Sequence, residues 1–199
     1  MKICGVTSLD DALAAADAGA DAIGFNLWPR SKRYAPLDGA RAIARAVAGR
    51  VERFGVFVDP TVEEVEAAFA AGAIDVAQLH GDEPGDFCAR FSGRYVKALR
   101  LAGERSLDDL AKYDCDRFLV DAPFAGYGGS GTLVDEELAK RAVARARVIL
   151  AGGLTADNVA GLIARVSPWG VDVASGVERA PGKKDHEKVR RFVAAAKAT

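Results

Sequence analysis

The sequence contains few cysteines and histidines, which limits the kinds of site that it can build. Its 199 residues include three cysteines, Cys4, Cys88 and Cys115, and two histidines. The cysteines are odd in number, widely spaced and form no C-x-x-C pair, so we expect neither a disulfide framework nor a structural zinc site. No His, Cys, Asp and Glu residues cluster at metal-ligand spacing, so we predict no metal. A reducing compartment, the cytoplasm, is the expected location.

The sequence also lacks a surplus of charge and a long apolar run. Its 27 basic and 28 acidic residues leave a net charge of -1, which does not favour nucleic acid or an anionic membrane as a partner. The opening Met1–Gly5 turns polar at Thr7 without the pattern of a secretory signal. No apolar run approaches the roughly 20 residues that span a bilayer, so we expect no membrane partner.

Short apolar segments alternate with helical ones along the whole chain. Eight segments are predicted as strands: Lys2–Cys4, Ala22–Asn26, Phe54–Asp59, Val76–His80, Val96–Arg100, Phe118–Asp121, Val148–Gly152 and Val171–Ser175. Several of them are apolar without alternation, which is typical of parallel strands buried on both faces. The repeat averages roughly 25 residues, the size of a minimal strand–helix unit.

Eight such units could form either a closed (β/α)8 TIM barrel or an open, doubly wound sheet. Their even spacing, with no linker or break in composition, favours the barrel, whose size range begins at about 200 residues. We therefore predict an α/β fold in which residues 1–199 form one (β/α)8 barrel domain. Between the strands, helices are expected to begin at capping side chains: Ser8, Thr61, Ser106 and Asp185.

Reactive side chains gather where the predicted strands end, the face that carries the active site in such barrels. Cys4 ends the first strand, where it is either a small buried apolar residue or a catalytic thiol. Asp121 ends the sixth strand, where partial burial would keep a proton available, although capping or pairing would also explain it. Asp172 interrupts the eighth strand and needs a partner. His80 ends the fourth strand and fits either a structural or a functional role.

Two glycine-rich turns follow the last two predicted strands. Gly152 and Gly153 lie in the first turn, and Ser175 and Gly176 lie in the second. Glycine lets backbone N–H groups approach an anion, and barrels commonly bind phosphate at these two positions. A tight turn would explain either glycine loop alone, but the pair predicts a phosphate site. Arg33, in a basic loop after the second strand, either meets an anionic group of the ligand or is solvated.

A further stretch, Gly126–Gly131, fits the pattern G-x-G-x-x-G. It follows the sixth strand rather than the first, and no acid lies roughly 20 residues on to hold a ribose, so we reject a dinucleotide site. Thr132 stands where a Walker loop requires Lys. Two interpretations of this stretch remain: a mobile loop that closes over the site, or a long flexible connection.

Several motifs, taken in order, resemble those of the phosphoribosylanthranilate isomerase family of tryptophan biosynthesis. The most specific are Lys2–Thr7 (KICGVT), Gln78–Gly81 (QLHG) and Asp172–Glu178 (DVASGVE). Further matches are Gly24–Phe25, Ser31–Tyr34, Gly55–Val58, Leu119–Asp121, Tyr127–Gly131, Ala151–Leu154 and Pro181–Asp185. Together these motifs cover essentially the whole chain.

The resemblance implies a barrel without a cofactor that acts on a small phosphorylated aminosugar. The family converts N-(5′-phosphoribosyl)anthranilate into 1-(2-carboxyphenylamino)-1-deoxyribulose 5-phosphate by an Amadori rearrangement. By motif, Cys4 would be the general base and Asp121 the general acid. Arg33 would meet the anthranilate carboxylate, Asp172 would accept a hydrogen bond from the anthranilate nitrogen, and His80 would line the site. The phosphate would be held by Gly152, Gly153, Ser175 and Gly176.

The implied chemistry suits these residue types, because opening the sugar ring needs an acid and removing the C2′ proton needs a base. A thiolate can be that base if nearby positive charge lowers its pKa. Asn26, Arg30 and Ala174 depart from the residues common in the family, which could alter substrate packing.

Two rival functions follow from the same residues. An isomerase that also accepts the related histidine intermediate would have Asp in place of Cys4 and a second phosphate loop, whereas Val58–Thr61 is not glycine-rich. A barrel that only binds a phosphosugar would lose the acid–base pair. The oligomeric state is open between a monomer and a homodimer.

Overall fold

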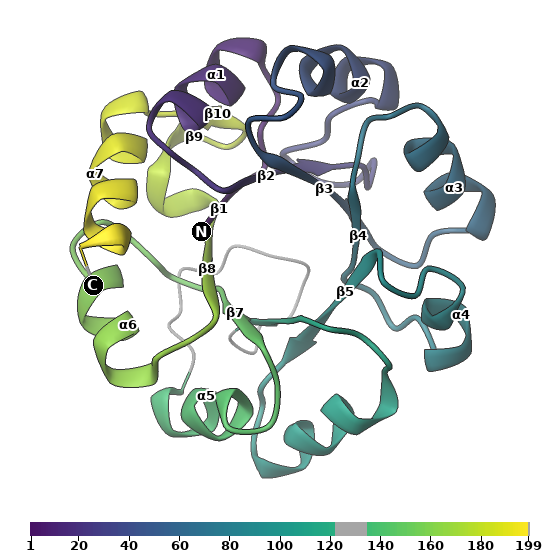
Figure 1. Cartoon of the computed structure of the whole chain (residues 1–199), viewed down its shortest axis with the longest axis vertical. Coiled ribbons are helices and arrows are strands. Elements are labelled where there is room, and N and C mark those ends of the chain that lie inside the picture. The colour runs from purple at the N-terminus through teal and green to yellow at the C-terminus, as the bar shows by residue number, and fades with distance from the viewer. Residues whose placement is uncertain (122–134, 199) are drawn as a thin grey trace.

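The computed structural model describes residues 1–121 and 135–198, so the predicted loop at Gly126–Gly131 lies outside the described residues. Eight parallel strands close a barrel in sequence order (Figure 1), and the last strand pairs with the first. The strands are β1 (Lys2–Cys4), β2 (Ala22–Asn26), β3 (Glu52–Phe57), β4 (Val76–Leu79), β5 (Tyr95–Arg100), β6 (Phe118–Asp121), β7 (Val148–Leu150) and β8 (Gly170–Val173). This closure confirms the (β/α)8 barrel over the open sheet.

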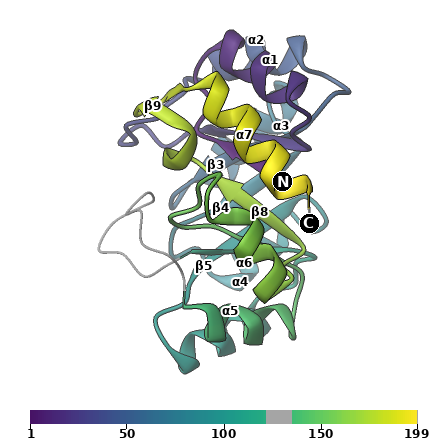
Figure 2. The same ribbon diagram turned by 90° about the vertical axis from the view of Figure 1, so that its left-hand side faces the viewer.

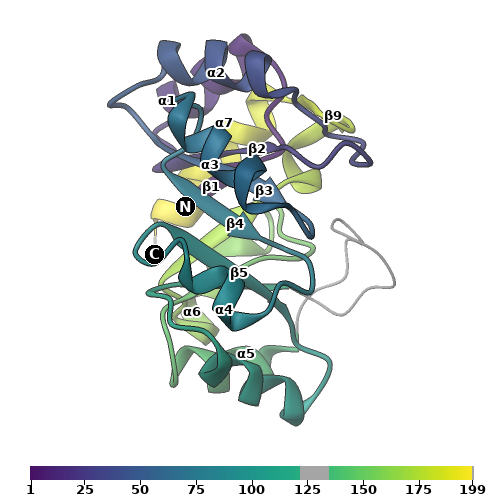
Figure 3. The same ribbon diagram turned by 90° about the vertical axis from the view of Figure 1, so that its right-hand side faces the viewer.

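Helices surround the strands as an outer layer, which Figures 2 and 3 show from two sides. The α-helices are α1 (Leu9–Asp17), α2 (Leu37–Ala46), α3 (Val62–Ala70), α4 (Gly85–Ala89), α5 (Glu136–Val143), α6 (Val159–Val166) and α7 (His186–Lys197). Two 3-10 helices, η1 (Glu104–Lys112) and η2 (Ser175–Val177), and an antiparallel hairpin of β9 (Glu178–Ala180) and β10 (Lys183–Lys184) complete the described elements. None of these helices is both long enough and apolar enough to cross a membrane.

Most of the predicted helix starts are confirmed. The Ser8 hydroxyl accepts a hydrogen bond at the start of α1, Thr61 forms a capping box with Glu64, and Asp185 caps α7. The start predicted at Ser106 is wrong, because Ser106 lies inside η1 and its hydroxyl bonds back to the Gly103 carbonyl. A local capping pattern therefore does not fix a helix start where tertiary contacts favour a 3-10 segment.

Some strand ends also differ from the prediction by one or two residues. The strand predicted to end at Asp59 ends at Phe57, and Asp59 has a positive φ of 46°. The strand predicted to end at Gly152 ends at Leu150, and Gly152 likewise has a positive φ of 88°. Consequently His80 is the first residue beyond β4, and Gly152 and Ser175 are the second residues beyond β7 and β8.

Alternation along the strands creates two apolar cores. The main core lies between strands and helices and includes Ile3, Ile23 and Phe25. A smaller cluster faces the barrel interior: Ala22, Phe54, Val76, Val96, Ala98, Leu119, Ile149 and Ala151. Lys2 and Cys4 flank the outward-facing Ile3 on β1, so their side chains point into the barrel with the smaller cluster.

Candidate active site

The predicted site residues line one pocket at the C-terminal ends of the strands. They are Cys4, Arg33, His80, Asp121, Gly152, Gly153, Asp172, Ser175 and Gly176. The pocket encloses about 800 Å³, its open mouth included, which is in the range for small-molecule sites. Among residues 1–121 and 135–198, no group of three or more His, Cys, Asp and Glu side chains is placed to hold a metal.

The two glycine turns lie against each other. Gly152 and Gly153 have positive φ angles of 88° and 60°, a conformation that other residues rarely adopt. A Cβ on Gly176 would collide with the carbonyl oxygen of Leu154, so only glycine fits there. The Asn158 side chain accepts from the Thr155 backbone N–H at 2.8 Å and donates to the Gly153 carbonyl at 2.9 Å. The Asn158 bonds therefore brace the loop after β7 internally, and the close approach of Leu154 to Gly176 sets that loop against the loop after β8.

Cys4 and Asp172 share a buried cation that the sequence did not single out. Lys2 Nζ lies 2.8 Å from Asp172 Oδ1, and the β1–β8 register places these two residues side by side. Asp172 therefore has the partner that its place in an apolar strand required. A lysine within a strand that is otherwise buried was the available signal for this pair.

The pKa of the Cys4 thiol differs from the expected direction. Burial raises this pKa above its usual value, and Lys2 and Lys184, which act in the opposite direction, do not overcome it. Nearby positive charge is thus present, but it only reduces the cost of ionising a buried thiol.

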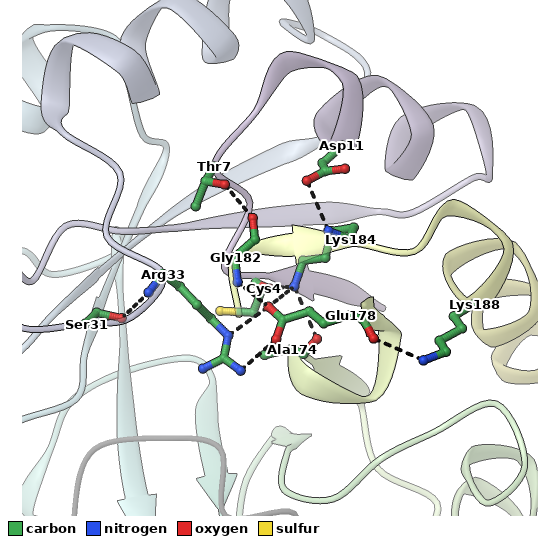
Figure 4. Close-up of polar contacts among 10 residues, drawn as sticks. All are labelled: Cys4, Thr7, Asp11, Ser31, Arg33, Ala174, Glu178, Gly182, Lys184 and Lys188. Atoms are coloured by element: carbon green, nitrogen blue, oxygen red, sulfur yellow. Dashed lines mark hydrogen bonds and ion pairs between the residues drawn. The ribbon is translucent and has the colours of Figure 1, made fainter. Parts of the chain in front are cut away.

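The Arg33 side chain is largely buried and is paired with Glu178, so the expectation of a solvated arginine is wrong. Its Nε and Nη2 donate to Glu178 Oε1 and Oε2 at 2.8 and 2.7 Å, and its side chain crosses Gly5, where a Cβ would lie 2.5 Å from Arg33 Cδ. Glu178 also accepts from Lys184 Nζ at 3.0 Å (Figure 4). Lys184 Nζ donates in addition to the carbonyl oxygens of Cys4 and Ala174. The hairpin β9–β10 therefore fixes the arginine at the mouth of the pocket.

His80 and Asp121 lie on other parts of the wall. Burial lowers the pKa of His80 to about 3, helped by Arg100 and Lys97, so its imidazole is neutral near pH 7. His80 Nδ1 lies 3.3 Å from Gln78 Nε2. Asp121 ends β6 beside Arg100, its neighbour on β5 in the sheet register.

Comparison with known proteins adds an independent line of argument. The family model for "N-(5'phosphoribosyl)anthranilate (PRA) isomerase" matches residues 1–195. A relative of that name from Rubrobacter xylanophilus is 48% identical over 99% of this chain and 98% of its own length. The crystal structure of phosphoribosyl anthranilate isomerase from Thermotoga maritima is 38% identical, with a TM-score of 0.91 over 100% of this chain and 98% of that one.

A third match is a structure of phosphoribosyl anthranilate isomerase in complex with reduced 1-(o-carboxyphenylamino)-1-deoxyribulose 5-phosphate. It is 36% identical, with a TM-score of 0.87 over 100% of this chain and 98% of that one. The family match, the close relatives and the barrel architecture agree. This chain belongs to the N-(5'-phosphoribosyl)anthranilate isomerase family, isomerases of tryptophan biosynthesis.

Proposed function

We propose that the chain rearranges N-(5′-phosphoribosyl)anthranilate into 1-(2-carboxyphenylamino)-1-deoxyribulose 5-phosphate, with Asp121 as general acid and Cys4 as general base. The observation that carries this proposal is that both side chains line the same pocket as the paired glycine turns. A phosphate held by those turns would place the sugar between a carboxyl group and a thiol. The match to a structure holding a reduced form of this product supports the choice of substrate.

The binding groups divide according to the charges of the ligand. The phosphate would sit against Gly152, Gly153, Ser175 and Gly176, where backbone N–H groups can approach it closely. Arg33 would bind the anthranilate carboxylate, because Nε and Nη2 bond Glu178, and Nη1 makes no hydrogen bond within residues 1–121 and 135–198. Asp172 would accept from the anthranilate nitrogen while it remains paired with Lys2. Neutral His80 would line the sugar.

The reaction then proceeds by a series of proton transfers, of which the proposed acid and base carry out the first two. Asp121 gives its proton to the ring oxygen, the C1′–O bond breaks, and the nitrogen lone pair forms a cationic imine at C1′. The imine acidifies the C2′ proton, which the Cys4 thiolate removes, and the electron pair left at C2′ neutralises the imine to give an enaminol. Protonation at C1′ and loss of the enol proton then yield the ketone.

The test is a fluorescence assay of the isomerisation on Cys4→Ser and Asp121→Asn. Each variant should lose about 10²–10⁴-fold in kcat, the usual contribution of a positioned acid or base. Cys88→Ser is the matched control, because Cys88 is a buried cysteine on α4 and should leave kcat near the wild-type value. Full activity of Cys4→Ser and Asp121→Asn would refute the roles, and phosphosugar binding without turnover by the wild type would favour the non-catalytic barrel. Cytoplasmic location and the choice between monomer and homodimer stay predictions.

A further inference from the structure

Lys2 is a cation inside the barrel that the proposed reaction does not use. Its side chain is buried, and its ammonium group lies 2.8 Å from Asp172 and 5.3 Å from the centre of the Phe54 ring. Burying a lysine is costly unless its charge is compensated. Here Asp172 and Cys4 outweigh burial, which alone would lower the pKa of Lys2, so this pKa lies above its usual value. Lys2 therefore stays charged inside the barrel, next to Asp172 of the pocket wall.

A missing side chain on the neighbouring strand brings Lys2 and Cys4 together. Gly24 on β2 is the register partner of Cys4. A Cβ on Gly24 would lie 3.0 Å from Cys4 Sγ, 3.0 Å from Lys2 Cε and 3.1 Å from Lys2 Nζ. The lysine arm and the sulfur thus converge on the space that any other residue at position 24 would fill. At this proximity the Lys2 charge favours ionisation of the thiol.

Other charges also act on the Cys4 sulfur. Asp172 on β8 opposes ionisation of the thiol, and Lys184 on β10 favours it. Arg33, from the loop after β2, is a further cation that interacts with Cys4. Lys184 and Arg33 are both engaged by Glu178. Lys2 is the cation whose side chain shares the Gly24 space with the sulfur, so it is the best placed to compensate a thiolate.

We propose that Lys2 is a positioning residue for the base, an ammonium group that Asp172 holds beside Cys4 Sγ so that the thiolate can form inside the barrel. This inference rests on the proposed function, because it assumes that Cys4 is the base. The thiol releases its proton to water through the open pocket, and the thiolate is left paired with the Lys2 ammonium. The thiolate then takes the C2′ proton. Lys2 keeps all its protons throughout and contributes charge alone.

The direct test is the rate at which iodoacetamide alkylates Cys4 in the folded protein, followed by peptide mass spectrometry to separate Cys4 from Cys88 and Cys115. Only the thiolate reacts, so the rate below the thiol pKa reports the thiolate fraction. Lys2→Met should slow alkylation of Cys4 about tenfold or more between about pH 7 and 9. Asp172→Asn should accelerate it, because a carboxylate that opposes ionisation is removed. Lys183→Met, an exposed lysine next in sequence to Lys184, is the matched control and should leave the rate unchanged.

Kinetics give a second readout that general structural damage would not reproduce. The kcat of Lys2→Met should fall about tenfold or more at neutral pH and recover as the pH rises, because alkali restores the thiolate. If Lys2→Met does not fold, the double variant Lys2→Met/Asp172→Asn leaves no unpaired buried charge and should still alkylate more slowly than Asp172→Asn alone.

The inference is overturned if folded Lys2→Met alkylates at the wild-type rate, or if the double variant matches Asp172→Asn. Full isomerase activity of Cys4→Ser would instead refute the proposed role of Cys4 as the base, whatever the alkylation rates show. The two failures are therefore distinguishable.

Discussion

Two buried lysines, one in the barrel and one in the β9–β10 hairpin, act on Cys4, and their surroundings differ. Lys2 points into the barrel, where Asp172, a residue of the pocket wall, holds its ammonium group. Lys184 comes from the hairpin outside the barrel, and its ammonium group is fixed by Glu178 and by the carbonyl oxygens of Cys4 and Ala174. Burial lowers the pKa of Lys184 despite Glu178, whereas that of Lys2 is raised.

The different partners of the two lysines indicate what each buried charge does in the hairpin and in the barrel interior. The Lys184 ammonium group donates to two backbone carbonyls and to Glu178, so its removal should harm folding. The Lys2 ammonium group lies near a carboxylate and a thiol that both line the pocket, so its removal should alter ionisation there. We therefore expect the same residue type to stabilise structure in the hairpin and to alter thiol ionisation in the barrel interior. The following predictions test this difference between the hairpin and the barrel interior.

The largest effect is expected for Lys184→Met. This change removes a donor from the buried Cys4 carbonyl and the partly buried Ala174 carbonyl and deprives Glu178 of one of its cations, so it should lower the free energy of unfolding by about 3–5 kcal/mol. Urea denaturation measures the loss, and Lys183→Met, the exposed neighbour, should change it by less than about 0.5 kcal/mol. A loss below about 1 kcal/mol would contradict the structural role assigned to Lys184.

An intermediate effect is expected from His80 in the barrel interior. The folded protein holds the pKa of His80 at about 3, whereas an unfolded histidine has a pKa near 6.5. Below pH 6.5 the unfolded chain binds the proton and the folded one does not, so stability is lost as the pH falls from 6.5 towards 3. Between pH 6.5 and 5 this should amount to about 2 kcal/mol. His80→Asn should reduce the acid-induced loss by that amount in urea denaturation; equal slopes in both proteins would contradict the burial of a neutral imidazole.

The barrel and most of the residues that line the pocket could be predicted from the sequence. Parallel strands buried on both faces leave an apolar signature, and their polar ends must lie at one face of the barrel. Lys2 and Glu178 were missed as functional neighbours because their burial depends on contacts between distant segments, such as the pairing of Lys2 with Asp172. A lysine in an otherwise buried strand signals that its charge is buried, but it does not identify the partner, and spacing does not reveal that Gly24 makes room for it.

A smaller effect is expected for Glu178→Gln, which tests whether the hairpin also serves binding. A neutral amide cannot hold Arg33 through two charge-assisted bonds, so the arginine should lose its orientation towards the anthranilate carboxylate. We expect KM to rise about tenfold, near 1.4 kcal/mol, with kcat changed less than about threefold. Steady-state kinetics measure both values, and the exposed Glu187→Gln serves as the control. An unchanged KM would confine the hairpin to a purely structural role.

The smallest effect is expected for Arg190→Ala on α7, which separates burial from ion pairing as the origin of the difference. Arg190 Nη2 lies 2.6 Å from Glu187 Oε2, as short as the contacts of the two buried lysines, but the two side chains are 60% and 66% exposed. Solvent screens such a pair, and holding two long side chains offsets the gain, so its loss should cost less than about 0.5 kcal/mol in urea denaturation. A loss comparable to that of Lys184→Met would mean that Lys184 stabilises the fold through its ion pair with Glu178. Its hydrogen bonds to backbone carbonyls would then contribute little to the free energy of unfolding.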